Sequence, residues 1–88
     1  MQTKILVLDD EKEIADLVTL YLRNEGYSVH EFYDSEDALH FLRHNEVDLA
    51  LLDVMMPKID GFEICRQIRE NYTFPVIMLT AKIEDVDK

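Results

Sequence analysis

Residues 47–53 of the chain read Val-Asp-Leu-Ala-Leu-Leu-Asp, an almost continuous apolar run that ends in a carboxylate. Such a run, without polar alternation, is typical of a β-strand that is covered on both faces. Two other segments have the same character: residues 4–9 (Lys-Ile-Leu-Val-Leu-Asp) and residues 74–80 (Phe-Pro-Val-Ile-Met-Leu-Thr). The sequence therefore predicts a sheet whose main strands are buried on both sides.

Segments with helical periodicity separate these strands. Gly26 stands where a left-handed C-terminal cap would end the first helix, and Ser35 is suited to cap the start of a second helix. A third helix follows Gly61, and residues 27–32 form a shorter, more polar strand near the sheet edge. In the first helix the apolar residues recur at i, i+3, i+4, i+7 and i+8, which predicts one buried stripe of Ile14, Leu17, Val18, Tyr21 and Leu22.

The order of elements is thus β-α-β-α-β-α-β. Strands joined by crossover helices form a parallel sheet with right-handed connections. The fold class predicted is therefore α/β, with a doubly wound parallel sheet that ends after its fourth strand.

Composition restricts the class of protein. The chain has 88 residues, enough for one domain, and a net charge of −10, which disfavours direct contact with nucleic-acid phosphates. A lone cysteine, Cys65, cannot form an internal disulfide, which indicates a reducing compartment. The apolar run from Ile5 to Leu8 is too short for a signal peptide or a membrane span. We therefore expect a cytoplasmic protein with no membrane contact.

Reactive side chains stand where three of the predicted strands end. Asp9 and Asp10 follow the first strand, Asp53 ends the third, and Thr80 ends the fourth. Since parallel α/β sheets bind ligands at the carboxyl ends of their strands, we expect these side chains to lie together. Carboxylates of this kind suit Mg²⁺, which would screen Asp53 and let its carboxylate attack a phosphorus atom. Thr80 would then hydrogen-bond the resulting aspartyl phosphate.

These motifs resemble the receiver domains of bacterial two-component response regulators. The matching segments are residues 7–11, 48–57, 60–61 and 75–81, and the family pattern covers residues 4–82. The resemblance implies a flavodoxin-like fold, Mg²⁺ as the cofactor and a sensor histidine kinase as the partner. It further implies Asp53 as phosphoacceptor, a metal site formed by Asp9, Asp10, Asp53 and the Met55 backbone carbonyl, and Thr80 as the switch hydroxyl. Such a protein is a self-phosphorylating switch and not a turnover enzyme.

The motifs are most similar to those of regulators with a winged-helix DNA-binding output domain, including the regulators of vancomycin-resistance systems. The resemblance implies that a full-length form controls transcription through a domain outside this chain. The family pattern continues through a fifth strand, followed by a phosphate-contacting lysine that has no counterpart in residues 1–88. We therefore expect residues 1–88 to be a single, C-terminally incomplete receiver domain. Residues 76–79 would then be an exposed edge through which two chains associate.

Three other functions remain open. The chain could be an inactive or interaction-only receiver fragment. A Mg²⁺-dependent phosphohydrolase of the haloacid-dehalogenase type would need a second acid two residues after Asp53, where Met55 stands. A flavodoxin-like cofactor binder would need a phosphate loop rich in Gly, Ser or Thr after the first strand, where the chain has Asp-Asp-Glu-Lys-Glu.

Some of these residues also have simpler interpretations. Asp9 and Asp10 could serve only the N-terminus of the first helix. His40 and His44 have a helical spacing that can bind zinc, but no Cys or third His completes a site, so a solvated helix face is favoured. Cys65 shares an apolar stripe with Ile68 and is expected in the core.

Overall fold

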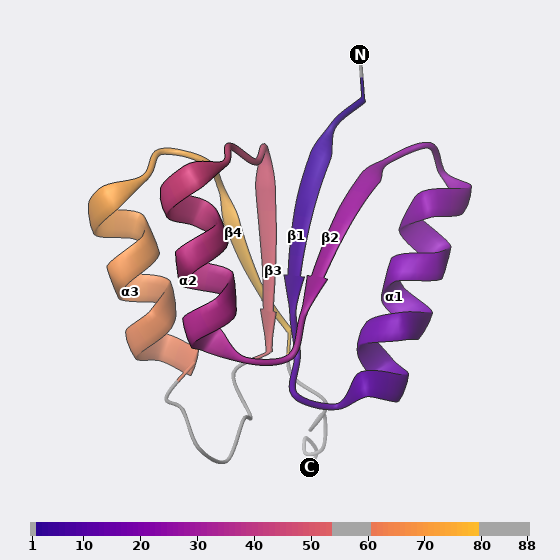
Figure 1. The fold of residues 1–88 in the computed structure, drawn as a ribbon, viewed down its shortest axis with the longest axis horizontal. Helices are drawn as coiled ribbons and strands as arrows, with labels where there is room; N and C mark the ends of the chain where they lie inside the picture. The colour runs from indigo at the N-terminus through magenta and orange to yellow at the C-terminus, as the bar shows by residue number, and fades with distance from the viewer. Residues whose placement is uncertain (1, 54–60, 80–88) are drawn as a thin grey trace, which may run out of the picture.

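The computed structural model describes residues 2–53 and 61–79, and it has alternating strands and helices (Figure 1). Their bounds are β1 Lys4–Leu8, α1 Lys12–Asn24, β2 Ser28–Phe32, α2 Ser35–His44, β3 Leu49–Asp53, α3 Gly61–Asn71 and β4 Val76–Leu79. The strands form one parallel sheet in the order β2-β1-β3-β4. The predicted doubly wound α/β fold and its order of elements are therefore confirmed.

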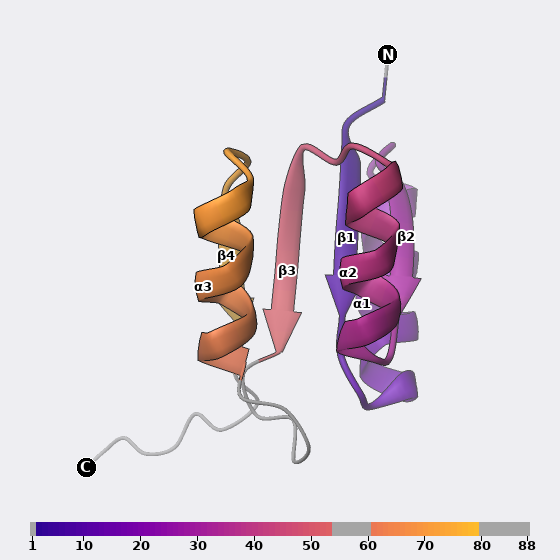
Figure 2. The same ribbon diagram turned by 60° about the vertical axis from the view of Figure 1, so that its left-hand side comes forward.

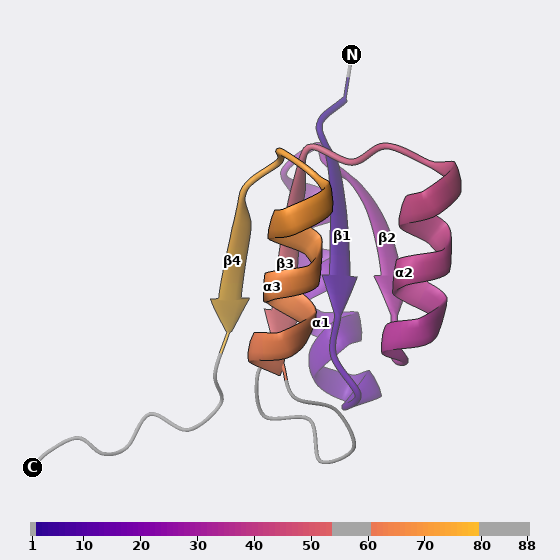
Figure 3. The same ribbon diagram turned by 90° about the vertical axis from the view of Figure 1, so that its left-hand side faces the viewer.

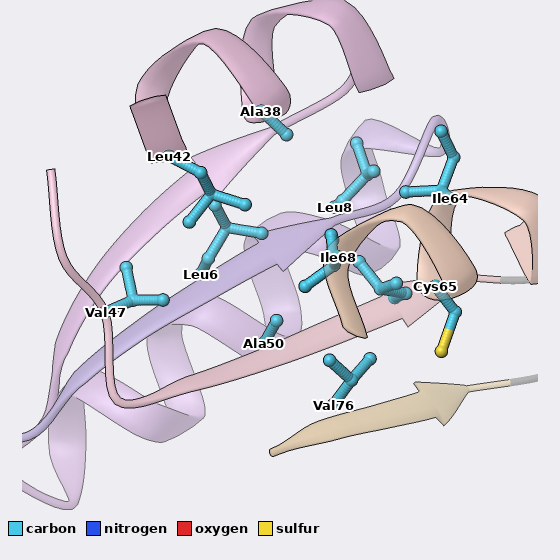
Figure 4. Close-up of a cluster of buried hydrophobic side chains, with 11 residues drawn as sticks. Leu6, Leu8, Ala38, Leu42, Val47, Ala50, Ile64, Cys65, Ile68 and Val76 are labelled. Atoms are coloured by element: carbon cyan, nitrogen blue, oxygen red, sulfur yellow. The ribbon is translucent and has the colours of Figure 1, made fainter. Parts of the chain in front are cut away.

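The helices cover the two faces of the sheet unequally. Figure 1 shows α2 and α3 on one face and α1 alone on the other. In Figure 2 all strand arrowheads point toward the same end of the molecule, as a parallel sheet requires. The first face holds the larger core cluster, in which Leu6, Ala50 and Ile68 are almost fully buried (Figure 4). Cys65 lies in this cluster, as expected from the sequence.

The buried stripe predicted for α1 is wrong in part. Leu17 and Tyr21 are 66% and 73% exposed, whereas the buried residues of this helix are Ala15 and Thr19. The remaining members of the predicted stripe, Ile14, Val18 and Leu22, are half-buried. The apolar stripe of α1 is therefore wider than the surface that the sheet offers to it.

The physical reason lies in where α1 sits on the sheet. This helix packs on β2 and β1, and its Arg23 guanidinium donates to the Val29 carbonyl at 3.1 Å. The Tyr33 hydroxyl donates to Asp16 on the same flank of the helix at 3.4 Å. By helical spacing, Leu17 and Tyr21 lie on the opposite flank of α1 from Asp16. Because α1 contacts β2 and β1, the half of this face formed by β3 and β4 lies beside the helix. Within residues 2–53 and 61–79, no helix covers that half of the face.

The helix ends follow local rules, with one correction. Gly26 has a φ of 96°, and its N–H donates to Arg23 while that of Tyr27 donates to Leu22, so the predicted left-handed cap is confirmed. The predicted cap at Ser35 is wrong, since Ser35 is already helical. Asp34 is the N-cap, and its carboxylate accepts the N–H of Glu36 at 2.8 Å. Neighbouring Asp and Ser are equally good caps, so sequence alone did not separate them.

Candidate functional site

The sheet register brings the acidic residues together. Strands β1 and β3 are neighbours, and Leu8 of β1 stands level with Leu52 of β3. The next residue on each strand is Asp9 or Asp53, so the two aspartates lie side by side at the carboxyl end of the sheet. Asp10 follows directly, where the chain turns toward α1. Three carboxylates that sequence analysis selected from distant segments therefore share one place.

Their geometry is compatible with a shared cation. Asp9, Asp10 and Asp53 each offer one carboxylate oxygen, and these oxygens all lie within 4.8 Å of one another. Asp9 and Asp53 are only 4% and 7% exposed, whereas Asp10 is exposed. The cluster thus has two acids inside the protein surface and one that faces solvent.

Asp9 is held from two sides. Its backbone N–H donates to the Phe32 carbonyl at 3.0 Å, which extends the ladder between β1 and β2 by one residue. Its carboxylate accepts the N–H of Glu11, the N-cap residue of α1, at 2.9 Å. The simpler interpretation of this segment, a helix start, therefore describes part of what Asp9 does. This hydrogen bond leaves Asp9 within the carboxylate cluster, so a role at the helix start does not exclude a role at a metal.

The electrostatics of the cluster favour added positive charge. The pKa of Asp9 is raised from 3.8 to about 6, chiefly by burial. A hydrogen bond to the Asp53 carboxyl and the negative charges of Asp53 and Asp10 raise this pKa as well. The hydrogen bond from the Glu11 N–H lowers it and offsets part of the rise. A cation placed among these carboxylates would offset their mutual repulsion and lower this pKa. Oxygen ligands with excess negative charge are those that Mg²⁺ prefers, so the residues present fit this ion.

Two predicted members of the site, Met55 and Thr80, lie outside the described residues, as does Pro57. Gly61, predicted to precede the third helix, is the first residue of α3. The described part of the site is therefore the carboxylate cluster at the ends of β1 and β3.

Comparison with known proteins identifies the family. The family described as response regulator receiver domain matches residues 5–88. The chain belongs to the response-regulator receiver family. It is 59% identical over all 88 residues to the regulatory protein VanRc of Enterococcus gallinarum, and 52% identical to the regulatory protein VanR of Enterococcus faecium. In both cases it spans 38% of the relative's length.

The receiver fold is also that of solved response regulators. The response regulator TrrA of Thermotoga maritima, solved in complex with Mg²⁺-BeF, superposes with a TM-score of 0.86 at 36% identity. The match covers 93% of this chain and 72% of that structure. These findings confirm the flavodoxin-like receiver class and the relationship to VanR-type transcription regulators. Among the described residues, no helix has the length and apolar character that crossing a membrane requires.

Proposed function

We propose that the chain is a phosphorylation switch in which Asp53 accepts a phosphoryl group from a sensor histidine kinase in the presence of Mg²⁺. The observation that carries this proposal is the convergence of Asp9, Asp10 and Asp53 within 4.8 Å at the carboxyl ends of β1 and β3. Membership in the receiver family and the Mg²⁺-BeF complex of TrrA support it. Residues 1–88 then act as one receiver domain.

The proposed roles of the three aspartates follow from their burial and their positions in the sheet. Asp53 ends a buried strand, so its carboxylate is held in place by the sheet. One of its oxygens attacks the phosphorus of a phosphohistidine, an O–P bond forms, and the P–N bond breaks with its electron pair returning to the imidazole, which takes up a proton. Asp9 and Asp10 would hold the cation. A bound Mg²⁺ would offset the negative charge that gathers between the carboxylates and the phosphoryl oxygens.

Two further roles rest on the family pattern. In this proposal Met55 offers its backbone carbonyl to the cation, and the Thr80 hydroxyl hydrogen-bonds the aspartyl phosphate. The product is one covalent adduct per chain and not the turnover of a free substrate, so the chain is a switch and not an enzyme. By analogy with VanR-type regulators, the switch operates in the cytoplasm, and a separate domain of a longer form contacts DNA and controls transcription.

The test is intact-protein mass after incubation with acetyl phosphate and Mg²⁺. We expect one phosphoryl adduct on the parent chain and none on Asp53→Asn. Asp48→Asn is the matched control: Asp48 lies just before β3, is exposed, and its carboxylate binds the Lys4 N–H at the far end of the sheet. This variant should be phosphorylated like the parent.

A folded parent chain that gains no adduct would overturn the phosphoacceptor proposal and leave the interaction-only receiver fragment. An adduct that persists in Asp53→Asn would place the reaction on another residue. Continuous release of phosphate from a free phosphomonoester would instead favour the phosphohydrolase.

A further inference from the structure

Helix α2 presents two histidines on one exposed face. His40 and His44 are both exposed, and the centroids of their rings lie 4.8 Å apart. Residues four apart are neighbours on a helix, so this proximity follows from the sequence spacing. Two imidazoles at this separation can turn one nitrogen each toward a common ion.

The structure adds a third polar group, which sequence analysis did not consider. Asp37, one helical turn before His40, lines the same hollow of about 420 Å³ as His40 and His44. Phe32 and Phe41 also line the hollow, their rings 5.1 Å apart, and both pack against the main core cluster. Two imidazoles and a carboxylate thus line one hollow, whose apolar side chains are packed against the core.

The backbone that carries these groups is fixed at both ends. Asp34 caps the start of α2, and the Asn45 side-chain amide donates to the Phe41 carbonyl at 3.1 Å in the last turn. The backbone that carries the two histidines is therefore already ordered as a capped helix. Little backbone conformational entropy is lost when an ion binds their side chains.

The donor set selects a class of metal. Imidazole nitrogen suits Zn²⁺, Cu²⁺ and Ni²⁺, whereas Mg²⁺ prefers oxygen ligands alone. The net charge of −10 attracts any cation to this chain. The hollow shares no lining residue with the cluster of Asp9, Asp10 and Asp53, and α2 carries His44 away from the carboxyl ends of the strands (Figure 1).

We propose that α2 binds one borderline transition-metal ion, typified by Zn²⁺, through the imidazoles of His40 and His44. Water completes the coordination, and Asp37 accepts a hydrogen bond from that water and balances the charge of the ion. The bound ion links two successive turns of α2 and stabilises the end of the helix. This site is independent of phosphorylation at Asp53.

The test is calorimetric titration of the tag-free chain with ZnCl₂ near neutral pH, in excess Mg²⁺ that fills the carboxylate cluster, with sedimentation to establish stoichiometry. We expect one Zn²⁺ per chain, with no change in the state of association when the ion binds. Affinity should fall more than roughly ten-fold in His40→Ala and in His44→Ala, since each removes a ligand, and by up to about ten-fold in Asp37→Asn, which removes only an outer contact. All three side chains are exposed, so these variants should keep the circular dichroism of the parent.

Two controls separate this site from other sites. His30→Ala removes a histidine that packs on Phe41 from β2, with ring centroids 4.7 Å apart, and that does not line the hollow. Asp53→Asn alters the carboxylate cluster. Both should bind Zn²⁺ like the parent. Unchanged affinity in His40→Ala, loss of binding in Asp53→Asn, or one Zn²⁺ bridging two chains would each overturn the proposal.

Discussion

At the scale of the residue, Asp9 is a buried carboxyl that works against the stability of the metal-free chain. Its pKa of about 6 lies above the ordinary 3.8, so the folded state holds this proton more tightly than the unfolded state. The stabilisation linked to that proton is fully present below about pH 3.8 and is lost as pH rises through about 6. At neutral pH the cluster therefore carries an unfavourable charge that a bound cation would relieve.

This predicts that Asp9→Asn stabilises the metal-free chain near neutral pH by about 1–3 kcal/mol. Asparagine removes the charge and keeps an oxygen to accept the Glu11 N–H. The gain should shrink as pH falls below about 6 and vanish near about pH 3, below both pKa values, where Asp9 is protonated in the folded and in the unfolded parent. Urea denaturation of parent and variant at both pH values measures the difference. Mg²⁺ should stabilise the parent more than the variant, and a variant less stable than the parent at neutral pH would contradict this account.

At the scale of the element, α1 is ended by a residue that the sequence displays. Gly26 closes α1 with a φ of 96°, a conformation that residues with a Cβ adopt at a cost. No atom lies within 4 Å of the position that a Cβ on Gly26 would occupy. The requirement for glycine at this position is therefore one of backbone conformation and not of space.

Replacing Gly26 by alanine should destabilise the chain by about 1 kcal/mol, since the left-handed conformation is costly for alanine. Glu25→Ala is the matched control: Glu25 is exposed, its φ is −88°, and the substitution should have little effect. Thermal or urea denaturation compares the three chains. Equal stability of Gly26→Ala and the parent would show that the cap makes no net contribution.

At the scale of the whole molecule, the described residues leave one half of one sheet face uncovered. Leu17 and Tyr21 flank it on α1, Leu49 and Leu51 of β3 are half-buried in it, and Ile77 of β4 is 47% exposed. β4 is also the outer strand at this edge of the described sheet (Figure 3). An apolar face beside an unpaired strand edge favours pairing with a second copy of the chain.

We therefore predict that the 88-residue chain self-associates through β4, and that association strengthens with salt because each copy carries a net charge of −10. Ile77→Lys places a charge on the edge strand and should shift the chain toward monomer. Tyr27→Lys is the control, since Tyr27 is an exposed aromatic residue that precedes the opposite edge strand β2. Sedimentation velocity at low and high salt measures both. A parent chain that stays monomeric at every salt concentration would contradict the prediction.

The sequence was sufficient for what depends on neighbouring residues. Continuous apolar runs marked β1, β3 and β4, helical spacing marked α1, and Gly26 marked its end, because each signal lies within a few residues of the element it describes. The acids were found for the same reason, since Asp9 and Asp53 directly end apolar runs. The order β2-β1-β3-β4 within the sheet is, in contrast, a finding of the structure.

Tertiary structure decided what depends on partners distant in the chain. Only the pairing of β1 with β3 brings Asp53 beside Asp9, and burial there, together with the neighbouring Asp53 and Asp10, raises the pKa of Asp9. The position of α1 over β2 and β1 decides that Ala15 is buried and Tyr21 is exposed, although both belong to apolar flanks of one helix. A periodic pattern determines which residues share a face of an element. The pattern does not determine which other segments pack on that face or how far a charged side chain is shielded from water. Both depend on the packing of segments that are distant in the sequence.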